Sequence, residues 1–267
     1  MEVRPICVIT NDDGIDSAGL HVLAAAAREA SYEVVVVAPV DEMSGTSAAM
    51  TTAASDRITV APVQLPELAE IAAYAVQAAP AFIAFTAVRG AFSQVPELLL
   101  SGINKGPNTG RSILHSGTVG AAMTAAIHGT RAAAFSLACN AGDNGSGLHW
   151  ATAATVAGQV IPWAARMPPG ILLNVNVPNV PACQLRGVRR GPLAPVGAFE
   201  LTLDATARDS LQVAVAGPAT APPAGTDAAL LTDCFASVSL VAPLCEPDES
   251  FAKWLAAACR AADPDQP

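Results

Sequence analysis

Short, uninterrupted apolar runs alternate with helical patterns over the first two-thirds of this 267-residue chain, and this rhythm constrains the fold most. The run at residues 34–37 is four consecutive valines, whereas a strand with one face in water would alternate apolar and polar residues. Similar runs lie at about 5–10, 98–100 and 132–137, with helical patterns at roughly 17–30, 80–92, 116–128 and 147–166. Strands buried on both faces and joined by helices predict an α/β fold with a doubly wound parallel (Rossmann-like) sheet.

The pattern changes after a further strand predicted at residues 171–177. Shorter β-like runs follow at 186–190, 198–203 and 210–215, then a strand near 235–241 and an amphipathic helix from about 249 to 261. These predict a small C-terminal antiparallel β extension and a C-terminal helix. We therefore expect a Rossmann-like core over residues 1–180, which carries the functional site, and an extension over 181–267 suited to oligomerisation.

Composition excludes several classes of function. The net charge is −9 and no cluster of Lys and Arg stands out, which argues against binding of a nucleic-acid polymer. No apolar run reaches the roughly 18–20 residues of a membrane span. The first five residues lack the pattern of a signal peptide, so we expect a cytoplasmic protein. The six cysteines are widely spaced, which favours buried thiols over disulfides or a zinc site.

The segment Asn11-Asp12-Asp13-Gly14 follows the first predicted strand directly and carries most of the functional information. Ligands bind at the carboxyl ends of parallel strands, and two adjacent carboxylates there call for a cation. Gly14 would supply the turn that lets both carboxylates face one point. A hard divalent metal, Mg²⁺ or Mn²⁺, is the simplest occupant. On these four residues alone, a solvated Asp-Asp-Gly turn fits equally well.

Three further loops should reach the same edge of the sheet. The segment 101–110 is rich in glycine, and its Asn104 offers a neutral oxygen to a metal. The segment 116–123 opens a helix with two hydroxyls and free N–H groups, as a phosphate site requires, although its small residues would also suit tight packing on the sheet. In the loop at 41–47, Ser44 could add a weak neutral oxygen to the metal.

Segments 10–16, 101–110 and 116–122 closely resemble the SurE family (survival protein E) of metal-dependent 5′/3′-nucleotidases. Segment 172–178 also resembles that family, as do, more weakly, Thr226-Asp227 and residues 235–240. The resemblance implies hydrolysis of nucleoside monophosphates and a homodimer or homotetramer assembled through the C-terminal extension. It implies one divalent metal ion per subunit, held by Asp12, Asp13, Ser44 and Asn104. It places the phosphate near Gly45, Asn108, Ser116, Gly117 and Thr118.

This set of residues suits hydrolysis by water. Two carboxylates with neutral Ser and Asn oxygens leave the metal charge only partly neutralised, so it can polarise a phosphoryl oxygen and activate water. The helix start at Ser116 could stabilise the other phosphoryl oxygens. No Cys or Ser nucleophile with a partner base stands out, which favours direct attack by metal-activated water. His115 could act as a general acid or simply make a local contact beside the helix start.

The chain departs from the family pattern near the expected entrance of the site. The family's Gly-Thr-Pro-Ala-Asp-Cys segment aligns with residues 78–83, where Ala79 and Phe82 replace Thr and Asp, and Ala48 stands where a His is frequent. We therefore expect a preference for more apolar or modified nucleotides. The motifs of haloacid-dehalogenase phosphatases and receiver domains are not visible. A specialised phosphorylated substrate, or a non-catalytic nucleotide-binding scaffold, remains the alternative.

Overall fold

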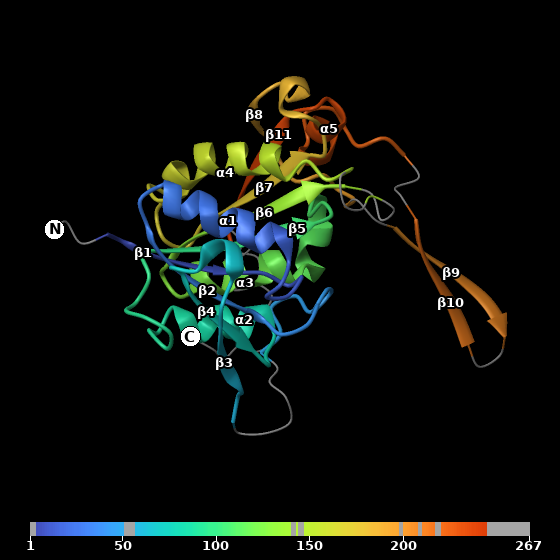
Figure 1. The fold of residues 1–267 in the computed structure, drawn as a ribbon. Coiled ribbons are helices and arrows are strands. Elements are labelled where there is room, and N and C mark those ends of the chain that lie inside the picture. Colours follow the sequence, from blue (N-terminus) through green and yellow to red (C-terminus); the bar gives the residue numbers. More distant parts are fainter. Residues whose placement is uncertain are drawn as a thin grey trace, which may run out of the picture.

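The computed structural model describes residues 4–50, 57–139, 143, 147–197, 200–207, 210–216 and 220–244. Within these residues a nine-stranded mixed sheet forms the centre of the molecule, in the order β3-β4-β2-β1-β5-β6-β7-β11-β8 (Figure 1). Its strands are β1 Ile6–Thr10, β2 Glu33–Pro39, β3 Val60–Val63, β4 Ala72–Val76, β5 Leu98–Lys105, β6 Arg131–Ala138, β7 Leu172–Pro178, β8 Val188–Arg190 and β11 Ala236–Val241.

Six neighbouring strands, β4 to β7 in the sheet order, run parallel to one another, which confirms the predicted α/β class. At one edge β3 pairs antiparallel with β4, and at the other β11 pairs antiparallel with β7. Neither β3 nor β4 was predicted from the sequence. Strand β3 contains a proline and lies largely exposed, and β4 is an apolar run made mostly of alanine, which does not favour strands.

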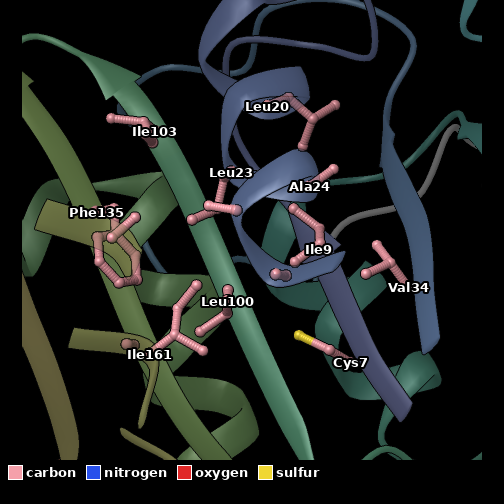
Figure 2. Packing of buried hydrophobic residues seen from close by; sticks show 14 of the residues in the cluster. Cys7, Ile9, Leu20, Leu23, Ala24, Val34, Leu100, Ile103, Phe135 and Ile161 are labelled. Atoms are coloured by element: carbon pink, nitrogen blue, oxygen red, sulfur yellow. The ribbon is translucent and has the colours of Figure 1, made fainter. Parts of the chain in front are cut away.

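Four helices cover the two faces of the parallel strands. Helices α1 Ala18–Glu29 and α4 Trp150–Ala164 pack on one face, and α2 Pro80–Ala87 and α3 Gly117–Ile127 pack on the other. In β1 the side chains alternate between these cores, with Cys7 and Ile9 in the first and Val8 in the second. Figure 2 shows the first core, where Leu20 and Leu23 of α1 lie against the sheet. Burial of both faces explains the continuous apolar runs.

The C-terminal part of the chain contributes strands to two separate sheets. Strands β8 and β11 extend the main sheet, whereas β9 Glu200–Ala207 and β10 Ser210–Ala216 pair as a separate antiparallel hairpin that projects from the body (Figure 1). A short helix not foreseen from the sequence, α5 Asp227–Thr232, precedes β11. The helix predicted at about 249–261 lies outside the described residues. The division of the chain near residue 180 stays a prediction.

The cysteine prediction holds only in part. Cys7 and Cys139 are free and buried, and burial raises the pKa of both thiols. The prediction of a buried thiol is wrong for Cys183, which is exposed because it lies in a surface 3₁₀ turn, Ala182–Gln184. Cys234 is partly exposed, and Cys245 and Cys259 lie outside the described residues. None of the described helices is long and apolar enough to cross a membrane.

Candidate active site

The loops singled out in the sequence converge at the carboxyl edge of the central strands. Because β1 lies between its parallel neighbours β2 and β5, the loops that follow the three strands meet at one place. The Met43 amide donates to the Asp12 carbonyl oxygen at 2.7 Å, which joins the loop after β2 to the loop after β1. The Lys105 amide donates to the Asp13 carboxylate at 3.1 Å, which joins the end of β5 to the same point.

Asn11 shapes the turn that presents the two carboxylates. Its side-chain amide donates to the Gly14 carbonyl oxygen at 2.9 Å and to the Ser17 hydroxyl at 2.6 Å. Gly14 has a φ of 96°, in the left-handed region that favours glycine. This closed turn replaces the solvated Asp-Asp-Gly turn that the sequence also allowed, because Asn11 and Asp12 are both buried.

Asp12 is attached to the start of helix α3. Its carboxylate accepts a hydrogen bond from the Thr118 amide at 3.0 Å and a second from the Thr118 hydroxyl. Gly117 permits this approach, since a Cβ atom at that position would lie 2.7 Å from a carboxylate oxygen of Asp12. The sequence placed Gly117 and Thr118 at a phosphate site. The structure brings both against Asp12.

The two carboxylates lie in an environment that disfavours their negative charge. Burial and, after it, the negative charge of the neighbouring Asp12 together raise the pKa of Asp13 to about 6. Burial also raises the pKa of Asp12, while its hydrogen bonds from Thr118 act in the opposite direction. The negative charge of Glu42 adds to the upward shift of both pKa values. A bound cation would relieve this repulsion.

The donor atoms fit a hard divalent metal. Asn104 uses its side-chain amide nitrogen to donate to the Gly106 carbonyl oxygen at 2.8 Å, which leaves its side-chain oxygen as the ligand atom. Ser44 is exposed, and its hydroxyl donates to the Glu42 carboxylate at 2.8 Å, which leaves the lone pairs of its oxygen for a metal. No group of three or more His, Cys, Asp or Glu side chains that could hold a metal ion occurs in the described residues. The candidate set is therefore two carboxylates with neutral oxygens, which suits Mg²⁺ or Mn²⁺.

The start of α3 lies beside this pair of carboxylates. Ser116 is the N-cap of the helix, and its hydroxyl oxygen accepts a hydrogen bond from the Val119 amide at 3.1 Å. The hydroxyl proton of Ser116 stays available to an anion. Gly45 lies in the exposed loop after β2 with a φ of 77°. His115 is exposed immediately before the N-cap, at the end of a 3₁₀ helix, Gly110–His115.

Asn108 is held by polar side chains that the sequence analysis did not single out. Its amide donates to the Asn176 side-chain oxygen at 2.8 Å, and its carbonyl oxygen accepts from the side chains of Asn176 at 2.8 Å and Asn174 at 2.9 Å. Its own side chain donates to the Ser136 hydroxyl at 2.9 Å. The available signal was the Asn-Val-Asn alternation in β7, which puts two buried polar residues on one face of a strand.

Asp227 was also missed as a residue that supports this loop. Its carboxylate is fully buried and accepts hydrogen bonds at 2.8 Å from the amides of Gly110, Ala194 and Ala228. It thereby joins the segment 106–110 to the segment before the β9–β10 hairpin. The sequence offered only a weak signal, the Thr-Asp pair, whose Thr226 caps helix α5.

Comparison with known proteins identifies the family of this chain. The family model "Survival protein SurE" matches residues 7–198. The 5′/3′-nucleotidase SurE of Serratia proteamaculans is 39% identical over 184 residues, which cover 68% of this chain and 67% of that protein. The 5′-nucleotidase SurE of Stenotrophomonas maltophilia is 36% identical over 185 residues, which cover 67% and 66%. The crystal structure of a SurE protein from Aquifex aeolicus matches with a TM-score of 0.75 over 93% of this chain and 98% of that chain, at 24% identity, and this likeness concerns the fold.

Proposed function

Because this chain belongs to the SurE family, we propose that it hydrolyses nucleoside 5′- or 3′-monophosphates to a nucleoside and inorganic phosphate. The proposal rests on one observation above all, the double hydrogen bond from Thr118 to the Asp12 carboxylate. It couples a pair of acidic side chains suited to a metal with a helix start suited to a phosphate. A metal-dependent phosphomonoesterase needs these two elements side by side.

Asp12, Asp13, Ser44 and Asn104 would hold one divalent metal ion, Mg²⁺ or Mn²⁺. A metal ion in this position supplies positive charge that polarises a phosphoryl oxygen and lowers the pKa of water. The protein residues position the reacting groups. Thr118 and Gly117 fix the orientation of Asp12, and the Lys105 amide fixes that of Asp13.

Ser116 and Asn108 are the residues that we assign to the phosphate. The Ser116 hydroxyl and the N–H groups at the start of α3 can donate to phosphoryl oxygens in a transition state with spread negative charge. Asn108 can add its side chain from the opposite loop, which Asn176 and Ser136 hold in place. Water then attacks phosphorus directly and the nucleoside oxygen leaves. Retention of configuration with a chiral thiophosphate substrate would contradict this single displacement.

The assembly and location of the protein belong to the same proposal. We assign the segment that includes the β9–β10 hairpin to contacts between subunits of a homodimer or homotetramer, with the protein in the cytoplasm. Light scattering after size-exclusion chromatography measures the subunit number. A monomer at micromolar concentration would contradict the oligomer.

The test of the activity uses metal-stripped protein with a panel of nucleoside 5′- and 3′-monophosphates, with and without Mg²⁺ or Mn²⁺. We expect release of inorganic phosphate only with metal, and its loss in the variant Asp13→Asn. The matched control is Asp16→Asn, because Asp16 is an exposed carboxylate in the same loop region. Nucleotide binding without phosphate release would favour the non-catalytic scaffold. Release from other phosphomonoesters but from no nucleotide would favour the specialised substrate.

A further inference from the structure

A cavity lies between the edge strand β3, its neighbour β4 and helix α2. Its volume is about 380 Å³, and the segment that follows α2 completes its walls. This volume lies within the range of small-molecule sites. Its walls are mainly apolar and include Val60, Tyr74, Val76, Phe82 and Phe92.

Aromatic rings from three different segments face this cavity. The ring centroids of Tyr74 in β4 and Phe92 after α2 are 5.8 Å apart, with an angle of 39° between the ring planes. Phe82 in α2 supplies the third ring. The hydroxyl of Thr86 is already bonded to the Phe82 and Ile83 carbonyl oxygens, at 3.1 and 2.9 Å. The walls therefore offer ring faces and one phenolic hydroxyl, which suits a flat aromatic group with polar edges.

One end of the cavity lies close to the carboxylate pair, at the carboxyl end of β4, where Val76 lines the wall. The Val40 amide donates to the Val76 carbonyl oxygen at 3.1 Å. The Val40 carbonyl oxygen lies 3.5 Å from the point where a Cβ atom would stand on Gly14, which follows Asp13 in the chain. Strand β4 is separated from β1 by β2 alone, so the two strands lie roughly 10 Å apart. A nucleoside monophosphate in an extended conformation covers a similar length.

The cavity and the start of α3 also lie on the same face of the sheet. Tyr74, Phe82 and Phe92 pack against the core shared by α2 and α3, and Asp12 bonds to Thr118 at the start of α3. A molecule that joins the two sites would therefore stay on one face of the sheet and pass the loop that follows β2.

We propose that this cavity binds the aromatic base of the phosphorylated substrate, and that it selects phosphomonoesters with an aromatic group over small aliphatic ones. The inference rests on the proposed nucleotidase function. Phe82 is a departure from the family motif that the sequence resembles, which carries Asp at this position. A carboxylate there would put a charge in the wall, whereas the phenyl ring gives a stacking surface.

The test compares two substrates in the presence of Mn²⁺, a purine nucleoside monophosphate and glycerol 2-phosphate. In the variant Phe82→Asp we expect kcat/KM for the nucleotide to fall about tenfold or more, mainly through KM, because base stacking is lost. The value for glycerol 2-phosphate should stay unchanged. The control is Trp163→Asp, since Trp163 is 46% exposed on helix α4, which covers the opposite face of the sheet, and does not line the cavity. Equal losses for both substrates, or no loss for the nucleotide, would overturn the proposal.

A second variant and a binding assay test the proposal if Phe82→Asp does not fold or if the wild-type protein has no activity. If Phe82→Asp does not fold, the variant Val60→Trp replaces it. Val60 is 43% exposed on the edge strand β3, so a tryptophan there can fill the cavity. It should give the same selective loss of kcat/KM for the nucleotide. If the wild-type protein hydrolyses neither substrate, the proposed function fails but the cavity is still tested by calorimetric titration with the free purine nucleoside. Binding that is weakened in Val60→Trp and unchanged in Trp163→Asp supports the cavity. Absence of nucleoside binding to the wild-type protein overturns it.

Discussion

Thr118 contacts the Asp12 carboxylate twice, through its amide nitrogen at 3.0 Å and through its hydroxyl. Both residues are buried, with Asp12 4% exposed, so water cannot replace either hydrogen bond. The two residues lie 106 positions apart in the chain, at the end of β1 and in the first turn of α3. The contact therefore fixes the position of the candidate metal site relative to the candidate phosphate site.

The variant Thr118→Val keeps the shape of the side chain and the amide hydrogen bond but removes the hydroxyl donor. Hydrogen bonds to charged groups contribute about 1.5–3 kcal/mol, so we expect Mn²⁺ affinity to fall about 10–100-fold. Calorimetric titration of metal-stripped protein measures this directly. Thr118→Ser, which retains a hydroxyl, should restore most of the affinity. Unchanged affinity in Thr118→Val would show that the hydroxyl has no effect on the metal.

The variant Asp13→Asn should stabilise the metal-free protein at neutral pH. The pKa of Asp13 is about 6 in the folded protein against 3.8 ordinarily, so the folded state binds more protons between these values. The free energy of unfolding therefore falls as pH rises from about 4 to 6, and this loss is complete at pH 7. Asn cannot ionise, so the variant does not lose this stability as the pH rises. Allowing for the partial exposure of Asp13, we expect its free energy of unfolding to exceed that of the wild-type protein by about 1–2 kcal/mol at pH 7. Urea denaturation in a chelator should show this gain at pH 7 and almost none at pH 4.

Metal should reverse this order of stability. A ligand at 100 times its dissociation constant stabilises the folded state by about 2.7 kcal/mol, and the metal needs Asp13 in its ionised form. Saturating Mn²⁺ at pH 7.5 should therefore raise the melting temperature of the wild-type protein and of Asp16→Asn, but hardly that of Asp13→Asn. The apparent affinity for Mn²⁺ should weaken about tenfold between pH 7.5 and pH 5, because the proton competes below pH 6. An affinity independent of pH would exclude Asp13 as a ligand.

Gly117 is required by the space beside Asp12. An added Cβ would lie 2.7 Å from a carboxylate oxygen and 2.9 Å from the Cβ of Asp12, so Gly117→Ala should push α3 away from the carboxylate. We expect a destabilisation of about 1–3 kcal/mol and a clear loss of phosphate release. Gly158→Ala in α4 is the control, because a Cβ there meets nothing within 4 Å and alanine favours the helix. Equal behaviour of the two variants would contradict a steric role for Gly117.

Local sequence predicted the central strands and the loops of the site because each of these signals lies within a few residues. Continuous apolar runs mark strands buried on two faces, and the parallel order brings the loops after them to one edge. The contacts of Asn176 and Asp227 could not be predicted in this way. Asn176 bonds to a residue 68 positions away and Asp227 to one 117 positions away, so their partners depend on how distant segments pack. A buried polar residue in a strand indicates that a partner exists, but it does not identify that partner.

Asn176 binds the Asn108 peptide as a neighbouring strand would, with one hydrogen bond accepted and one donated, both 2.8 Å long. The variant Asn176→Asp keeps an acceptor for the Asn108 amide but places a carboxylate oxygen against the Asn108 carbonyl oxygen. We expect repulsion, a destabilisation of about 1–3 kcal/mol and a displaced Asn108. If Asn108 contacts the phosphate, kcat should fall more than tenfold at 15 °C, where the variant is folded.

The control for Asn176→Asp is Ser239→Ala, which removes a buried hydroxyl from the neighbouring strand β11. That hydroxyl donates to the Gly191 carbonyl oxygen at 2.7 Å and does not touch Asn108. We expect Ser239→Ala to lower the melting temperature while kcat at 15 °C stays at the wild-type value. A fall in kcat that is confined to Asn176→Asp assigns Asn176 to the positioning of Asn108. If Asn176→Asp loses stability but keeps its turnover, then Asn176 supports the fold alone and Asn108 does not have to be held in place for catalysis.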